Sequence, residues 1–252
     1  MEQVLLRKKI RVSSVYLGHD ELDYDYPTIR LLCDSQTTDA AILCGQFDRG
    51  IELCAARGIP ILHAFHTPTL PYAQRTCQID RSAAFRGLLR HGKACGVKSI
   101  LVVMREEWDP ELQAVFATSG MRHTIFAVRI PSQDRLPADV EAAGYAAFAA
   151  TLEERPLPDL VYFADDHLLR GAIRAMDERG IRAPEHVLLA AQLNRGSEPA
   201  YQTSVSAVMM DPFAHGAALA QFVLDAVRIP GFQHEPTLIT AATRDDADAV
   251  AA

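Results

Sequence analysis

Short blocks of valine, isoleucine and leucine recur along the chain and predict a series of strands. Most of these blocks are continuous apolar runs and do not alternate apolar with polar residues. Runs of this kind are typical of strands that are buried on both faces, as in a parallel sheet covered by helices. The predicted strands are Ile10–Leu17, Ala40–Cys44, Ile59–Ala64, Ser99–Met104, Thr124–Ile130, Leu160–Phe163 and Val187–Ala191.

Helical periodicity appears between these blocks. Apolar residues spaced three and four positions apart predict helices over Ser82–Ala94, His167–Arg179 and Pro212–Arg228. We expect Asp165 or Asp166 to cap the second of these helices, and Gly180 to end it in the left-handed conformation.

One unit occurs three times along the chain, and it consists of a helix end, a glycine, a β-branched residue and a strand. The copies lie at residues 55–64, 93–103 and 177–191. In each copy the glycine closes a helix and the chain turns back into the sheet. This punctuation is typical of βαβ units and predicts a doubly wound parallel α/β fold.

Length and charge narrow the picture further. The chain has 252 residues, 49% of them hydrophobic, which is long for one core and sufficient for two lobes of roughly 100–150 residues each. The net charge of −7 argues against this segment holding nucleic acid itself.

The apolar runs, the N-terminal segment and the cysteines of the sequence favour a cytoplasmic location. No apolar run reaches membrane-spanning length, and the basic start at residues 7–9 is not followed by the apolar segment of a signal peptide. The five cysteines form no C-x-x-C pair, which suits reduced thiols. We therefore expect a cytoplasmic protein without membrane contact.

Residues 158–228 carry a family resemblance. The segment PDLVYFADDHLLRGAIRAMDERGIRAPEHVLLAAQLN (158–194) is followed by SVSAVMMDPFAHGAALAQFVLDAV (204–227), and the earlier segment GIPILHAF has the same character. In order and spacing these motifs resemble the effector-sensing domain of LacI/GalR-type transcription regulators. The segment LNRGSEP (193–199) is similar to a subgroup in which that domain follows a GntR-type winged helix.

The resemblance implies a periplasmic-binding-protein-like fold of type I. Such a fold has two Rossmann-like lobes, expected here at residues 1–95 with 208–229 and at residues 96–207 with 230–252. Ile10–Leu17 then corresponds to the family's second strand. We therefore expect the first strand and the DNA-binding headpiece to be missing by truncation, unless Met1–Leu6 supplies a substitute strand.

Candidate ligand-binding residues follow the carboxyl ends of predicted strands, where open α/β sheets bind ligands. They are His66, Trp108, Gln113, Asp165, Asp166, Asn194 and Arg195. Each has a plainer alternative: Asp165 or Asp166 as a helix cap, Trp108 as a packing residue, and Arg195 as a solvated loop charge. Sugar-binding relatives carry an arginine near the position of Gln113 and an aspartate near Asn194, so these two amides put a simple sugar ligand in doubt.

The sequence shows no catalytic or metal-binding pattern. It contains no G-x-S-x-G elbow and no phosphate-loop or dinucleotide motif, and His63 and His66 have no third ligand in view. We expect a small-molecule sensor that uses no cofactor, forms a homodimer and contacts DNA only through the missing headpiece. A solute receptor of the same fold is the alternative, and an α/β enzyme is a more remote one.

Overall fold

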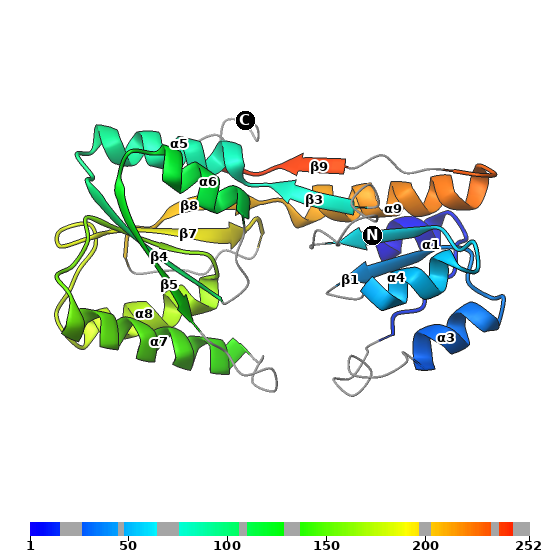
Figure 1. The fold of residues 1–252 in the computed structure, drawn as a ribbon, viewed down its shortest axis with the longest axis horizontal. Coiled ribbons are helices and arrows are strands. Elements are labelled where there is room, and N and C mark those ends of the chain that lie inside the picture. Colours follow the sequence, from blue (N-terminus) through cyan, green and yellow to red (C-terminus); the bar gives the residue numbers. More distant parts are fainter. Residues whose placement is uncertain are drawn as a thin grey trace. The chain divides into compact units, whose positions relative to one another are not determined.

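The computed structural model describes residues 1–15, 27–44, 48–64, 76–105, 110–128, 137–196, 203–232 and 237–243. The chain divides into two units, each with its own sheet. The first comprises Met1–Asp80 and Asp211–Ile239, and the second comprises Arg81–Met210 and Thr240–Ala252. The chain therefore passes between the units three times (Figure 1).

The sheet of the second unit has the strand order β10-β8-β7-β6-β4-β5. Five of its strands run parallel, and β10 pairs with β8 in the antiparallel direction. Continuous apolar runs build the middle of this sheet because both faces are covered. The strands are β4 (Ser99–Arg105), β5 (Arg122–Val128), β6 (Leu160–Phe163), β7 (Leu188–Asn194), β8 (Ser206–Met210) and β10 (Ala242–Thr243).

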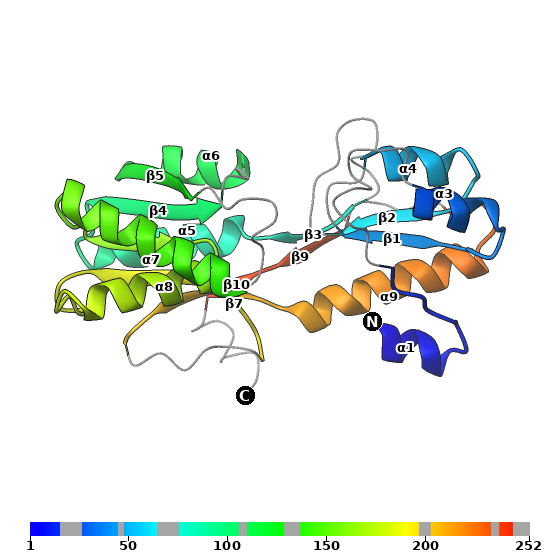
Figure 2. The same ribbon diagram turned by 90° about the horizontal axis from the view of Figure 1, so that it is seen from below.

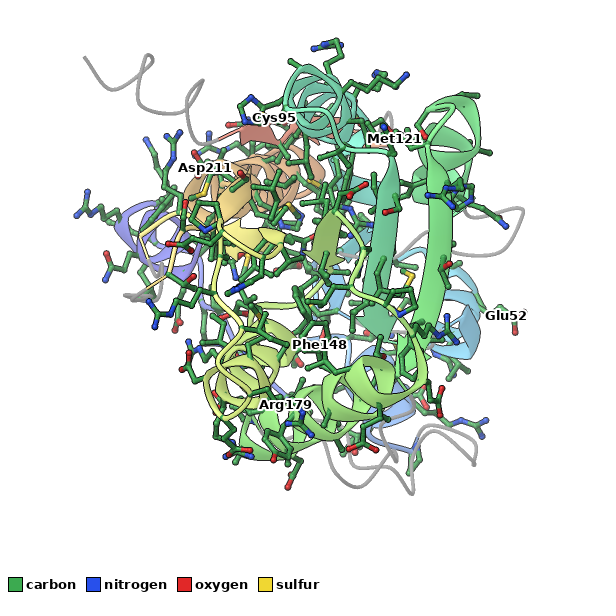
Figure 3. The ribbon with its side chains drawn as sticks, turned by 90° about the vertical axis from the view of Figure 1, so that its left-hand side faces the viewer. Glu52, Cys95, Met121, Phe148, Arg179 and Asp211 are labelled. Atoms are coloured by element: carbon green, nitrogen blue, oxygen red, sulfur yellow. The ribbon has the colours of Figure 1, made fainter. Side chains whose placement is uncertain are left out.

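Helices cover both faces of this sheet (Figures 1 and 2). One face carries α5 (Ser82–Ala94) and α6 (Pro110–Thr118), and the other carries α7 (Pro137–Glu154) and α8 (Asp166–Asp177). Aromatic rings fill both layers of the core. The Phe85 and Tyr162 rings meet edge to face at 4.7 Å on the α5 side. On the other side the ring of Phe148 of α7 (Figure 3) lies 5.8 Å from that of Phe163.

Two glycines allow α7 and α8 to touch backbone to backbone. A Cβ atom placed on Gly171 would collide with the carbonyl oxygen of Glu141 and lie 2.5 Å from the amide nitrogen of Tyr145. A Cβ atom on Gly144 would lie 2.7 Å from the Cα atom of Leu168. Because neither position has room for a side chain, this glycine pair sets the spacing of the two helices.

The sheet of the first unit has the order β1-β2-β3-β9, with β1, β2 and β3 parallel. Helices α3 and α4 lie on one face, and α1 and α9 lie on the other (Figure 2). Buried Leu5 of α1 packs into the same apolar cluster as Leu219 of α9. The elements are α1 (Glu2–Arg7), α3 (Pro27–Asp34), β1 (Ala41–Cys44), α4 (Asp48–Ala55), β2 (Ile61–Ala64), β3 (Thr76–Asp80), α9 (Pro212–Arg228) and β9 (Thr237–Thr240).

The predicted α/β fold class is confirmed, but the predicted strand Ile10–Leu17 is wrong over its described part. Residues 10–15 pair with no strand. After α1 the backbone reverses through Lys9 at φ 62°, and the amide of Ile10 donates to the carbonyl of Leu5 at 3.0 Å. Ile10 and Val12 then pack against the apolar cluster that contains Leu5 and the buried residues of α9. The substitute strand at Met1–Leu6 is also wrong, because this segment forms α1.

The unit boundaries differ from the expected ones in three places. Residues 208–210 were expected in the first lobe, but they end the second unit's segment Arg81–Met210. Helix α5 was expected in the first lobe, but it contacts β8 and β10 and groups with the second unit. Residues 230–239 were expected in the second lobe, but β9 completes the sheet of the first unit.

Among the helices of the described ranges, none combines the length and the apolar character needed to cross a membrane.

Candidate ligand-binding site

The carboxyl ends of five parallel strands meet at one edge of the second unit's sheet. In the register, Phe163 of β6 lies beside Ala191 of β7, and Asn194 of β7 lies beside Met210 of β8. Asp165 comes two residues after the end of β6, and Asn194 is the last residue of β7. The topology therefore brings Asp165 and Asn194, which are 29 positions apart in sequence, to the same edge from neighbouring strands.

Asp165 is the N-cap of α8, as expected for one member of the acidic pair. Its backbone is extended (φ −149°, ψ 133°), and its Oδ1 accepts a hydrogen bond of 2.9 Å from the amide of His167. A carboxylate accepts more than two hydrogen bonds, so capping and contact with a ligand are compatible. The side chain is half-buried, which strengthens hydrogen bonds made there.

Asp166 points into a charge network on the first turn of α8. Its carboxylate pairs with Arg170 at 3.4 Å, one helical turn along. Arg170 also pairs with Glu141 of α7 at 3.3 Å, and the Nδ1 atom of His167 lies 3.6 Å from the same carboxylate. This network links the N-terminus of α8 to α7. We therefore assign Asp166 a structural role in this contact ahead of a role in ligand binding.

Asn194 and Arg195 form the exit from β7. The Asn194 side chain is exposed and that of Arg195 is half-buried. The amide of Arg195 donates to the carbonyl of Met210 at 2.8 Å, which extends the pairing of β7 with β8 by one bond. Gly196 then turns the chain at φ 83°, a conformation that favours glycine.

Of the three remaining candidates, Gln113 lies within the described residues. Gln113 is exposed in the first turns of α6, the helix that follows β4 along the chain. His66 and Trp108 lie outside the described residues, so their assignment to the site stays a prediction.

Sequence reasoning missed a polar link behind this edge. Arg81, which precedes α5, donates from Nη1 to the Oε1 atom of Gln192 at 3.0 Å. Gln192 lies on β7 two residues before Asn194, so both side chains leave the strand on the same face. The two partners are 111 positions apart in sequence, and no local pattern signals their contact.

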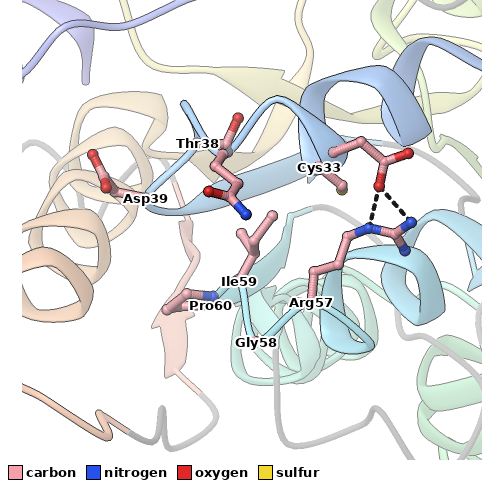
Figure 4. A pocket seen from close by; sticks show the side chains of 9 residues that line it. Cys33, Thr38, Asp39, Arg57, Gly58, Ile59 and Pro60 are labelled. Atoms are coloured by element: carbon pink, nitrogen blue, oxygen red, sulfur yellow. Dashed lines mark hydrogen bonds and ion pairs between the residues drawn. The ribbon is translucent and has the colours of Figure 1, made fainter.

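The first unit contains a hollow of about 480 Å³ at the edge of its sheet where the parallel strands β1 and β2 begin, called the amino edge below (Figure 4). Its lining includes Asp39, just before β1, and Pro60, just before β2. Arg57 at its rim is already paired with Asp34, and both side chains are substantially exposed. The hollow is open and its guanidinium is neutralised, so it is a poor candidate for the main ligand site.

The chain belongs to the periplasmic binding protein-like domain family, whose sequence profile matches residues 89–245. This match covers more than half of the chain. No curated protein matches the sequence.

Solved structures extend the similarity to both units. A LacI family transcriptional regulator from Enterococcus faecium with bound ribose is similar at a TM-score of 0.75 and 15% identity, over 96% of this chain and 88% of that one. A ribose-bound regulator of the same family from Enterococcus faecalis V583 gives 0.77 and 13%, over 96% and 88%. A lactose complex from Arthrobacter sp. FB24 gives 0.76 and 16%, over 96% and 88%. At these identities the similarity establishes the fold, and it confirms the predicted periplasmic-binding-protein-like architecture.

Proposed function

We propose that this chain is the small-molecule-sensing and dimerisation domain of a LacI/GalR-type transcription regulator and that it catalyses no reaction. The observation that carries the proposal is the polar carboxyl edge of the second sheet, where Asp165 and Asn194 converge in a fold shared with sugar-bound regulators. In open α/β sheets this edge is where ligands bind.

The chemistry of the site suits a polar, hydroxyl-rich metabolite. Asp165 supplies a carboxylate acceptor, while Asn194 and Gln113 supply amides that both donate and accept. Arg195 adds a cation, and we propose His66 and Trp108, which lie outside the described residues, as further ligand contacts. Asp166 would contribute charge from the network that it forms with Arg170.

The proposed sensing mechanism uses the division of the chain into two units, which three chain connections join. A ligand that binds one arrangement of the units better than another shifts the population towards it, by no more than its difference in affinity. We propose that a cytoplasmic homodimer passes this change to DNA. Because the net charge is −7, the DNA would be held by a separate domain.

Thermal unfolding in the presence of a sugar panel that includes ribose and lactose tests the proposal. A ligand at 100 times its dissociation constant stabilises the folded state by about 2.7 kcal/mol. A confirmed ligand should lose at least tenfold in affinity in Asp165→Ser and in Asn194→Ala when it is measured by calorimetric titration.

The serine variant separates binding from capping. Serine caps helices as well as aspartate does but carries no charge, so α8 should stay intact while the carboxylate is lost. Glu153→Gln is the matched control, because Glu153 is an exposed carboxylate in the last turn of α7, at the opposite end of the unit. Equal affinity in all three variants and the parent would refute the site.

A further inference from the structure

Two buried cysteines of the first unit touch each other. The Sγ atoms of Cys33 in α3 and Cys54 in α4 lie 3.4 Å apart, and the two residues are only 5% and 3% exposed. Both thiols are free. They belong to the apolar cluster that joins these two helices to the sheet.

We propose that Cys33 and Cys54 form a reversible thiol–disulfide site, in which glutathione disulfide or a similar small disulfide oxidises the pair to an intramolecular bond between α3 and α4. The sulfur atoms have to approach by about 1.4 Å to reach the bond length of about 2.05 Å. Two neighbouring helices can make such a move through side-chain rotation with a small shift of one turn.

Access to the pair comes from the hollow at the amino edge, because Cys33 is one of the residues that line it (Figure 4). Cys54 is not part of this lining. The outer thiol, Cys33, is therefore the one that meets the oxidant first.

The exchange proceeds in two balanced steps. The Cys33 thiolate attacks one sulfur of glutathione disulfide, and one glutathione thiolate leaves. Cys54 then gives its proton to solvent and attacks the Cys33 sulfur, which displaces the second glutathione thiolate. Two electrons pass from the protein dithiol to one glutathione disulfide, and excess glutathione drives the same steps backwards.

The surroundings of Cys54 suit the second role. Burial and contact with Cys33 raise the pKa of the Cys54 thiol, and the nearby Arg57 guanidinium lowers it in part, so that together they bring it to about 12. A protonated thiol is a weak nucleophile towards outside reagents. Held in contact with Cys33, it nevertheless has a high effective concentration for the internal step. Oxidation should therefore be slow and accelerate with rising pH.

The test equilibrates the folded chain at pH 8 in glutathione buffers that span roughly −300 to −180 mV, followed by acid quench, trypsin and mass spectrometry. Cys33 lies in the tryptic peptide 31–49 and Cys54 in the peptide 50–57. We expect these two peptides to become linked with the loss of two hydrogens. For the chain unfolded in urea, the equilibrium constant for forming this bond should be at least tenfold smaller. The midpoint of its oxidation should therefore lie at least about 30 mV higher for a two-electron couple.

Cysteine variants identify the bond. The peptide 31–49 also contains Cys44, so Cys44→Ser should keep the link whereas Cys33→Ser should abolish it. If only exposed Cys44 and Cys95 gain glutathione and no link forms in the most oxidised buffer, the proposal is wrong. It is also wrong if the link survives in Cys33→Ser, or if folded and unfolded chains share one midpoint.

Discussion

Replacing Gly171 with alanine should destabilise the second unit. In an ordinary helix this change stabilises by about 1 kcal/mol, because alanine has the higher helix propensity. Here the new Cβ atom would lie 2.5 Å from the amide nitrogen of Tyr145 and closer still to the carbonyl oxygen of Glu141. Both of these are backbone atoms of α7, so no side chain can rotate away.

The helices can relieve this contact only by moving apart by roughly 1 Å, which loosens the apolar layer that they share with the sheet. Overpacking of this kind costs about 1–3 kcal/mol and occasionally more. The contacts are so short that we expect an overpacking cost at the upper end of this range. The higher helix propensity of alanine offsets part of that cost, which leaves a net loss of stability of about 1–2 kcal/mol.

Urea unfolding followed by far-ultraviolet circular dichroism measures this change. Gly92→Ala in α5 is the matched control, because its Cβ atom would meet Val97 at 3.6 Å, an ordinary contact distance. That variant should be neutral or slightly more stable. A Gly171→Ala protein as stable as the parent would show that the glycine contact does not set the spacing of α7 and α8.

Two further predictions concern titratable groups. Asp159→Ala should cost about 1 kcal/mol of stability near pH 7, because the Asp159 carboxylate accepts hydrogen bonds from the amide of Lys98 and from the amide and hydroxyl of Ser99. These bonds hold the pKa of Asp159 below its usual range, so the difference from the parent in urea titrations should shrink as pH falls below about 4. A difference that stays constant with pH would contradict this role. Burial lowers the pKa of His215, whose ring donates to the carbonyl of Cys77 at 3.1 Å. The unfolded state therefore binds the proton more readily, and the free energy of unfolding should fall as pH drops below about 6.5. In urea titrations from pH 8 to 5, His215→Gln should flatten this fall in stability, and an unchanged slope would exclude His215 as the cause.

Much of the fold could be predicted because burial leaves a strong pattern. The strand β6 and the helices α5 and α9 have the bounds that the sequence predicted, since each is an unbroken apolar run or a clear amphipathic repeat. Helix α7 was missed because its alanines lie on every face and leave no apolar stripe. Strand β3 was missed because TCQID has too few apolar residues to look like a strand.

The site was less accessible to sequence reasoning, since helix caps and ligand contacts use the same residue types. Asp165 illustrates this: the structure confirms the capping role, which any Asp before a helix predicts. The glycine contact between α7 and α8 and the link from Arg81 to Gln192 depend on residues far apart in sequence. Such pairings arise from the register of the sheet and have no local signature.

The two amides of the proposed site, Gln113 and Asn194, would determine how it holds a ligand. Where the resemblance to sugar-binding relatives implies an arginine and an aspartate, this chain has Gln113 and Asn194, so one positive and one negative charge are absent together. Loss of only one would leave an unbalanced charge at the sheet edge, whereas loss of both keeps the local charge unchanged. Hydrogen-bonding capacity remains, because each amide both donates and accepts. What disappears is the bidentate grip of a guanidinium, so ligand hydroxyls would be held by neutral amides and by the carboxylate of Asp165.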